Sequence, residues 1–187
     1  MYLVTMTLKL LYLSLIGRSL TAVCNSIYFQ INELGIKNPN DWKLDLAISE
    51  TSSQRVEDLT NKFTSYKNEF ETSKDFPMPQ VEGFTISEFN VIDIINTIES
   101  HLKKYEKENV NTIIFDITAG RKIMSVAITL SAIKFWRNNK NRDVRIAYFL
   151  LKNLKKNSDK LAPELFPDEY EIRTWSVEEI TKLMDMV

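Results

Sequence analysis

The sequence is poor in the residues that most catalytic and metal sites use. Its 187 residues include one histidine, His101, and one cysteine, Cys24. A single cysteine excludes a disulfide within the chain and any metal site built from several cysteines. Because the chain also has a single histidine, a zinc hydrolase and a Ser-His-Asp triad complete within one chain are disfavoured. Any chemistry must come from hydroxyls, carboxylates, amines, guanidinium groups or backbone amides, and we expect neither a metal nor a cofactor.

The chain also lacks an excess of either charge. It has 24 Lys and Arg against 25 Asp and Glu, which gives a formal net charge of -1. No global field would hold such a chain on nucleic acid non-specifically, so a polyanion would need a local binding site. No winged-helix pattern is recognisable after residue 160. We therefore do not expect duplex DNA as a partner.

Long apolar runs are scarce. Residues 1–17 are apolar enough to resemble a signal peptide, but Lys9 lies inside the run and Arg18 interrupts its expected end. Val23 is an awkward residue before Cys24 for a lipoprotein cleavage site. No other segment approaches the roughly 18 apolar residues that a membrane span needs. We expect a cytoplasmic protein without membrane association.

What the chain does have is a regular alternation of apolar and amphipathic segments, as a parallel α/β sheet requires. Strands are predicted at residues 8–16, 43–50, 111–118 and 144–151, with a short one at the end of 75–87 and a sixth at 169–175. Helices are predicted at residues 21–34, 55–70, 90–108, 123–136 and 176–186. The pattern predicts one Rossmann-like α/β domain, a mainly parallel sheet of about six strands with helices on both faces. Its core would span about 7–152, followed by a C-terminal strand and helix at about 169–187.

Several helix ends carry their own signals. Gly35 is a good C-terminal cap for the first helix, and Asn90 can cap the N-terminus of the third. Ser176 and Glu179 have the spacing of a capping box at the last helix. His101 lies on a charged stretch that reads as a solvated face, whereas the apolar segment 123–136 reads as a central buried helix.

One strand-to-helix turn, "DITAGRKIM", has the composition of an anion site. Gly120 lets the backbone approach a ligand closely, and the next helix presents unpaired N–H groups. Arg121 offers a bidentate fork and Lys122 a mobile point charge. Cations at a helix start oppose the macrodipole, so a binding role is favoured over simple solvation. Phosphate is the expected guest.

The turn after the first strand repeats this pattern with Gly17, Arg18, Ser19 and Thr21. Ligands of parallel sheets sit beyond the carboxyl ends of the strands, so the two turns would share one site if their strands are neighbours. Ser19 also has a plainer interpretation, because a serine before a helix is often its N-cap.

A third turn, "ETSSQ", is a weaker candidate. Ser52, Ser53 and Gln54 could donate hydrogen bonds to a sugar or a base. They could equally cap the helix that follows.

Two segments together resemble a known family. Residues 116–134, "DITAGRKIMSVAITLSAIK", resemble the hallmark motif of the CRISPR-associated Rossmann-fold (CARF) proteins, and residues 13–29, "LSLIGRSLTAVCNSIYF", resemble their other hallmark. The former is fairly specific and the latter is weak alone. The family often has Gly-Gly or Pro-Gly where Ala119 and Gly120 stand here, and threonine where Arg121 stands. The order of the elements also fits, so the resemblance covers most of the chain.

The resemblance implies a function. Effector members of the family carry a second domain, which we do not expect here, and a stand-alone domain of this type looks like a ring nuclease. Such an enzyme ends type III CRISPR antiviral signalling by cleaving cyclic oligoadenylate, typically cyclic tetra-adenylate. The family implies a homodimer with the ring on the two-fold axis. The ribose 2′-hydroxyl would attack its own phosphate without a protein nucleophile, and the products would end in a 2′,3′-cyclic phosphate.

On this reading Ser19, Arg121 and Lys122 form the catalytic set. The ligand-binding residues would be Gly17, Arg18, Thr21, Ser52, Ser53, Gln54, Thr118, Ala119, Gly120 and Met124.

Three alternatives remain open. The first is a sensor or sponge that holds the ring without cutting it, because binding and slow cleavage use the same groups. The second is a generic nucleotide-binding enzyme, although neither G-x-G-x-x-G nor G-x-x-x-x-G-K-[ST] is present. The third is a DNA-binding regulator, which the balanced charge disfavours.

Overall fold

The computed structural model describes residues 8–16, 19–52, 54–70, 73–106, 108, 110–157 and 159–185. The strands are β1 Leu10–Ile16, β2 Trp42–Ser49, β3 Gln80–Ile86, β4 Thr112–Asp116, β5 Asp143–Leu151 and β6 Tyr170–Ser176. The helices are α1 Leu20–Glu33, α2 Val56–Glu69, α3 Val91–Glu106, α4 Lys122–Asn138, α5 Leu154–Asn157 and α6 Val177–Met184. All six predicted strands and all five predicted helices are present, with bounds that differ by a few residues.

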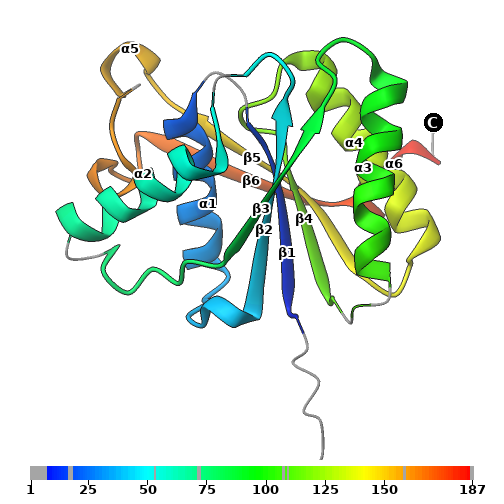
Figure 1. The fold of residues 1–187 in the computed structure, drawn as a ribbon, viewed down its shortest axis with the longest axis horizontal. Helices are drawn as coiled ribbons and strands as arrows, with labels where there is room; N and C mark the ends of the chain where they lie inside the picture. Colours follow the sequence, from blue (N-terminus) through cyan, green and yellow to red (C-terminus); the bar gives the residue numbers. More distant parts are fainter. Residues whose placement is uncertain are drawn as a thin grey trace, which may run out of the picture.

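The strands form one sheet in the order β3-β2-β1-β4-β5-β6. All neighbouring pairs are parallel except β5 and β6, which are antiparallel. The chain starts in the middle of the sheet and winds outward in both directions, so the order reverses between β1 and β4 (Figure 1). This is the Rossmann-like α/β fold that the sequence predicts.

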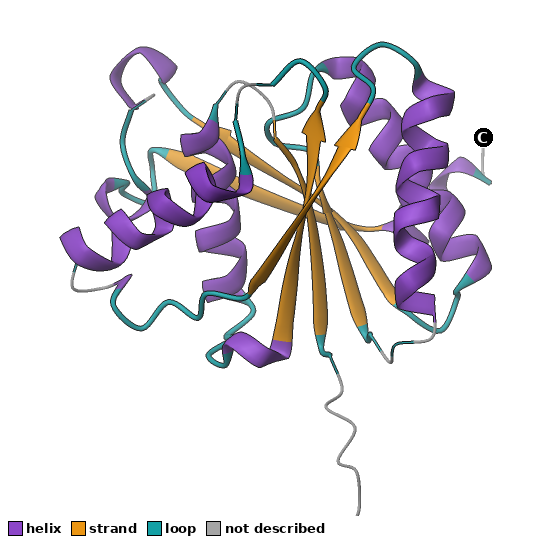
Figure 2. Ribbon diagram, viewed as in Figure 1, coloured by secondary structure: helices purple, strands orange, loops and turns teal. Residues whose placement is uncertain are grey.

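Helices cover both faces of the sheet. Helices α1 and α2 lie on one face and α3, α4 and α6 on the other, as the helix and strand colours of Figure 2 make clear. β1 is buried throughout, with Leu11, Leu13 and Leu15 in the core cluster under α3 and α4. Leu10 and Tyr12 belong to the cluster under α1 and α2. A strand buried on both faces explains why residues 8–16 are almost continuously apolar.

The predicted helix ends are partly confirmed. Gly35 has a φ of 65° and follows α1, and the next residue, Ile36, donates its N–H to the Ile31 carbonyl over 3.2 Å, as in a Schellman motif. The Asn90 Oδ1 accepts the N–H groups of Ile92 and Asp93 at the start of α3. Ser176 is the N-cap of α6, but its side chain makes no capping hydrogen bond. The prediction of a capping box at Ser176 and Glu179 is therefore wrong, although Ser176 is the N-cap residue.

Helix α4 is not the fully buried helix that its composition suggests. Its inner face packs in the core through side chains such as Met124 and Ile128. Val126 and Leu130, one turn apart on the other face, are 53% and 44% exposed. The segment therefore has an apolar surface as well as an apolar core face.

The prediction for His101 is wrong. Its side chain is 9% exposed, and its Nε2 lies 2.7 Å from Oδ2 of the buried Asp45. The ring stacks on Phe84 with centroids 3.8 Å apart. Tyr105, one turn later on α3, donates its hydroxyl to the other oxygen of Asp45 over 3.0 Å. A buried carboxylate in β2 thus contacts two side chains on the face of α3 that meets the sheet.

Within the described part of the chain, no helix is both long and apolar enough to cross a membrane.

Candidate functional site

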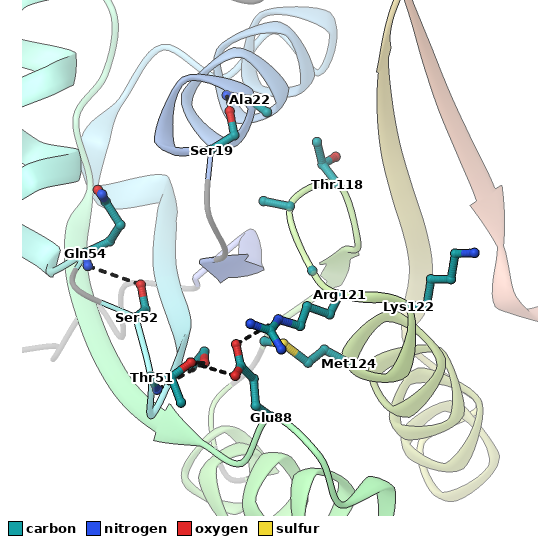
Figure 3. Close-up of a pocket in the computed structure, with 13 residues that line it drawn as sticks. Ser19, Ala22, Thr51, Ser52, Gln54, Glu88, Thr118, Arg121, Lys122 and Met124 are labelled. Carbon is teal, nitrogen blue, oxygen red and sulfur yellow. Dashed lines mark hydrogen bonds and ion pairs between the residues drawn. The ribbon is translucent and has the colours of Figure 1, made fainter.

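A pocket lies beyond the carboxyl ends of β1, β2 and β4, at the point where the strand order reverses. Ligands of open α/β sheets bind at this position. The pocket has a volume of about 890 Å³, within the usual range for ligand sites. Its described lining residues are Ser19, Ala22, Ser49, Thr51, Ser52, Gln54, Glu88, Thr118, Ala119, Gly120, Arg121, Lys122 and Met124 (Figure 3). All three turns named from the sequence therefore meet at one pocket.

The β4–α4 turn is held by a buried carboxylate. Asp116, at the end of β4, accepts the N–H of Thr118 over 2.9 Å and the hydroxyl of Ser14 in β1 over 3.0 Å. Asp116 is fully buried, and this burial raises the pKa of its carboxyl above the ordinary value. The Asp-x-Thr pattern thus fixes the path of the backbone as it leaves the sheet.

Thr118 shapes the same turn with its side chain. Its Oγ1 accepts the N–H of Phe149 in β5 over 2.9 Å, and its hydroxyl lies 3.2 Å from Oγ of Ser26 in α1. The β4–β5 ladder ends at Asp116 and Ala147, so the Thr118 side chain extends the pairing by one step. Thr118 lines the pocket while its hydroxyl is occupied by the scaffold.

Gly120 permits a close approach between the turn and the end of β1, and it also lines the pocket. Its backbone does not have a positive φ, which among the described glycines occurs only at Gly35. A Cβ at Gly120 would overlap the side chain of Leu15 and come within 3.0 Å of Oγ of Ser125. The glycine lets the turn pack directly onto the end of β1.

The N-terminus of α4 opens onto this turn. Arg121 is the N-cap residue and makes no side-chain capping bond. The first hydrogen bond of the helix runs from the N–H of Ser125 to the Arg121 carbonyl over 2.9 Å. The N–H groups before Ser125 have no partner within the helix and carry partial positive charge, as an anion site requires.

Arg121 is held at the pocket wall by Glu88, a residue that the sequence reading missed. The Nε atom of Arg121 lies 3.0 Å from Oε1 of Glu88, whose side chain is only 6% exposed. Thr51, after β2, donates its hydroxyl to the other oxygen of Glu88 over 2.6 Å. The Arg121 guanidinium also lies 5.7 Å from the ring centre of Phe89. Contacts among these residues therefore join three loops, as Figure 3 shows for Thr51, Glu88 and Arg121.

Lys122 lines the pocket, but its side chain does not converge with that of Arg121. Figure 3 shows the Lys122 ammonium pointing away from Arg121 and Glu88, and the residue is exposed. Two adjacent residues in a chain seldom aim at one point, because they project in different directions from the first turn of a helix. The sequence predicts that both cations face one anion, whereas in the structure their side chains point in different directions.

Ser19 combines the two interpretations that the sequence leaves open. It is the N-cap of α1, and its Oγ accepts the N–H of Ala22 over 3.2 Å. A hydroxyl that accepts one hydrogen bond still has its own O–H to donate. Ser19 is exposed and lines the pocket, so this O–H is available to a ligand.

The remaining candidates fall into three groups. Ser52, Gln54, Ala119 and Met124 line the same pocket. Thr21 lines a second cavity of about 200 Å³ between α1 and the end of β5, which shares Ser19, Ala22 and Thr118 with the first. Gly17, Arg18 and Ser53 lie outside the described residues.

Ser52, which follows β2, does not cap α2. The Oγ of Ser52 accepts the N–H of Gln54 over 3.1 Å. The N-cap of α2 is Arg55, whose N–H donates to Oδ2 of Asp58 over 2.7 Å. The capping alternative for Ser52 is therefore wrong, and its side chain shapes the turn at the pocket wall.

Cys24 offers no nucleophile. The residue is buried in α1, and burial raises the pKa of its thiol to about 12. At neutral pH the thiolate, which is the reactive form, is absent.

No protein-family model matches this chain, and a comparison with curated proteins also gives no match. Two solved structures are similar at 12% sequence identity over 74% of this chain. One is Can2 from Sulfobacillus thermosulfidooxidans in complex with cyclic tetra-adenylate, with a TM-score of 0.45 and 31% of that chain covered. The other is Enterococcus italicus Csm6 bound to cyclic hexa-2′-fluoro-hexa-dAMP, with a TM-score of 0.46 and 34% covered. This chain thus spans about a third of the length of each.

Proposed function

We propose that this protein is a metal-independent ring nuclease that cleaves cyclic oligoadenylate and so switches off type III CRISPR antiviral signalling. Cyclic tetra-adenylate is the expected ring, and the products would be linear and end in a 2′,3′-cyclic phosphate. The observation that carries the proposal is the pocket at the strand-order reversal, where the N-termini of α1 and α4, Arg121 and several hydroxyls converge. The motif resemblance of residues 13–29 and 116–134 supports the same ligand.

The chemistry suits the groups present. The ribose 2′-oxygen attacks the adjacent phosphorus, a bond forms between them, and the bond from phosphorus to the 5′-oxygen breaks. The 2′-proton passes to water, and the leaving 5′-oxygen takes a proton from water. The protein has to hold the three reacting atoms in line and to stabilise the charge that develops on the phosphate oxygens.

Each role falls to a described residue. Arg121 and the free N–H groups of α4 would face the phosphate, and the Ser19 hydroxyl would donate to the scissile phosphate or the ribose. Lys122 would serve a neighbouring phosphate of the ring, since its side chain points away from Arg121. Thr118 and Gly120 would hold the loop that presents these groups.

The first experiment follows the products. Purified protein is incubated with cyclic tetra-adenylate and cyclic hexa-adenylate in EDTA, and the products are identified by liquid chromatography and mass spectrometry. We expect cyclic tetra-adenylate to give di-adenylate with a terminal 2′,3′-cyclic phosphate. A cyclic tetra-adenylate whose 2′-hydroxyls are replaced by fluorine should not be cleaved. Ser19→Ala should lower the cleavage rate by about tenfold or more while the ring still binds. A folded protein that neither binds nor cuts either ring would contradict the proposal.

A sensor that binds the ring without cutting it is the second candidate. One observation favours it: Glu88 is the sole carboxylate among the described lining residues, and it is ion-paired with Arg121. No described lining residue is a histidine, so the pocket offers no obvious general base. Intact ring bound after prolonged incubation would select this candidate.

A homodimer forms part of the proposal, because the family resemblance implies a ring that lies on the two-fold axis between two copies of the chain. An exposed apolar surface adjoins the pocket and suits a second copy of the chain. Phe89 and Ile92 at the start of α3 are 66% and 64% exposed, and Val126 and Leu130 are exposed on α4. Phe89 lies against Arg121, so this surface reaches the wall of the pocket. Burying such a patch against its symmetry mate is the usual source of dimer stability.

We therefore expect Val126→Glu to convert the dimer to a monomer and to lower ring cleavage by about tenfold or more, because a charge would be buried at the interface. Analytical ultracentrifugation measures the first effect and the product assay the second. Phe166→Glu is the matched control, since Phe166 is 66% exposed in the segment before β6, and residues 162–164 of that segment pack on α1, on the other face of the sheet from α4. A Val126→Glu protein that stays dimeric would remove α4 from the interface.

A further inference from the structure

We infer that Glu88 sets the charge selectivity of the pocket, so that it accepts phosphodiesters and discriminates against terminal phosphomonoesters. The inference rests on the proposed function, because it concerns which phosphate Arg121 meets. Glu88 is not named by either sequence motif, since it follows β3 and precedes α3.

The position of Glu88 is fixed on several sides. Thr51 donates to Oε2 over 2.6 Å, and Thr51 in turn lies 3.2 Å from Oγ of Ser49 at the end of β2. Asn90, two residues later, caps α3 with its own side chain and so anchors the loop. The Glu88 side chain is only 6% exposed, so these contacts and its burial hold the carboxylate in the pocket wall.

The contact between Glu88 and Arg121 leaves part of the guanidinium for a ligand. The ion pair is made by Nε, at 3.0 Å from Oε1 of Glu88. The two terminal nitrogens of an arginine carry four further N–H donors in the plane of the fork. The Arg121 side chain is 41% exposed and lines the pocket, so its outer edge can meet a phosphate while Glu88 holds its inner edge.

Glu88 also lowers the positive potential that Arg121 presents. A phosphodiester carries one negative charge, whereas a terminal phosphomonoester carries close to two at neutral pH. The Glu88 carboxylate, directly behind the arginine, offsets the positive charge of Arg121. It therefore repels the second negative charge of a monoester. Selection of this kind suits a protein whose substrate has only diester linkages. Linear oligonucleotides with terminal phosphates would then compete poorly for the pocket.

The test compares two linear ligands that differ only in the terminal group. Both are tetra-adenylates with 2′-fluoro groups, one with a 5′-hydroxyl and one with a 5′-phosphate, and their Kd values are measured by calorimetry. A 2′-fluoro cyclic tetra-adenylate reports on the proposed function itself. For the native protein we expect the 5′-phosphate to leave the Kd within about twofold or to raise it.

In Glu88→Gln, which keeps the size and the acceptor oxygen of the side chain, the 5′-phosphate should improve binding by about tenfold. Affinity for the cyclic ligand should change by less than about threefold, because its phosphates carry one charge each. In Arg121→Gln the 5′-phosphate should weaken binding, because Glu88 is left without this cation. This variant tests the inference if Glu88→Gln does not fold.

The outcomes are distinguishable. If the native protein binds the ring and the 5′-phosphate has the same effect in all three proteins, Glu88 does not set selectivity and the proposed function stands. If the native protein binds none of the ligands, the proposed function fails and the inference fails with it.

Discussion

Replacing Arg121 with alanine is expected to weaken binding of cyclic tetra-adenylate by about 100-fold. A hydrogen bond to a charged group contributes roughly 1.5–3 kcal/mol, and a two-fold symmetric site would lose two of them. The loss also leaves the buried Glu88 without this counter-ion inside the pocket, which repels the ring further. Calorimetry with the 2′-fluoro ring measures the effect on binding without cleavage.

Lys122→Ala should have a smaller effect on binding, of about tenfold or less, because its side chain points away from the Arg121 side of the pocket. An exposed and mobile ammonium contributes less than an arginine held by a carboxylate. Equal losses in the two variants would show that the ligand meets both cations at one phosphate, contrary to the geometry of the free protein.

Arg137→Ala is the matched control for both variants. Arg137 lies on the same helix, in its last turn and exposed, roughly 24 Å from Arg121 along the axis. It removes the same charge from the chain without touching the pocket. At that distance the attraction between an exposed charge and a ligand in the pocket is largely screened, so Arg137→Ala should leave binding almost unchanged, and a loss confined to Arg121→Ala reports on the site.

The sequence predicts the sheet well because its signals are local. Period-3.6 helices, apolar strands and the caps Gly35 and Asn90 can each be recognised within a few residues. The convergence of the three turns also follows, because the carboxyl ends of parallel strands share one edge of a sheet. The β4–α4 turn is visible in sequence because its Asp-x-Thr and Gly120 act on neighbouring backbone.

What the sequence does not show depends on pairs that are distant along the chain. Glu88 is 33 residues before Arg121, and only the strand order 3-2-1-4 brings their loops together. A glutamate after a strand is an ordinary surface residue unless its partner is known. One signal for Glu88 is present in the sequence: it follows the carboxyl end of β3, at the same edge of the sheet as the other candidate turns.

The prediction that the segment 123–136 is a fully buried helix is wrong for a related reason. Its apolar residues surround the helix axis, so the pattern does not distinguish the face that meets the sheet from the one that does not. Met124 and Ile128 lie in the core, while Val126 and Leu130, with similar side chains, face outward. In the proposed dimer this outer face would be buried against another copy of the chain.

The buried Asp45 should be the most sensitive polar residue in the sheet. Its carboxylate is 1% exposed and receives His101 at 2.7 Å and Tyr105 at 3.0 Å, with Lys104 at 3.7 Å. Burial, with Asp45 close by, raises the pKa of Tyr105 well above its usual range, so this hydroxyl remains a donor at all ordinary pH values. Removing the acceptor leaves two buried polar side chains without this partner.

We expect Asp45→Ala to lower the free energy of unfolding by about 3–5 kcal/mol, as measured by urea denaturation, because breaking a buried pair costs far more than the pair itself contributes. Asp143→Ala is the control, since Asp143 pairs with Arg145 at 2.8 Å but both side chains are about 40% exposed. That change should cost less than about 1 kcal/mol. Equal losses in the two variants would show that the Asp45 contacts contribute no more than a surface pair.

Asp45→Ala is also expected to affect ligand binding at the pocket. Asp45 fixes the face of α3 that carries His101, and the loop before α3 carries Glu88 and Phe89, which hold Arg121. If this anchor positions the loop, Asp45→Ala should weaken binding of the ring at temperatures where the variant is still folded, and Asp143→Ala should not. His101→Phe, which keeps an aromatic ring against Phe84 but leaves Asp45 without the imidazole, should reproduce the loss. Unchanged ring binding in a folded Asp45→Ala protein would confine this buried cluster to stability alone.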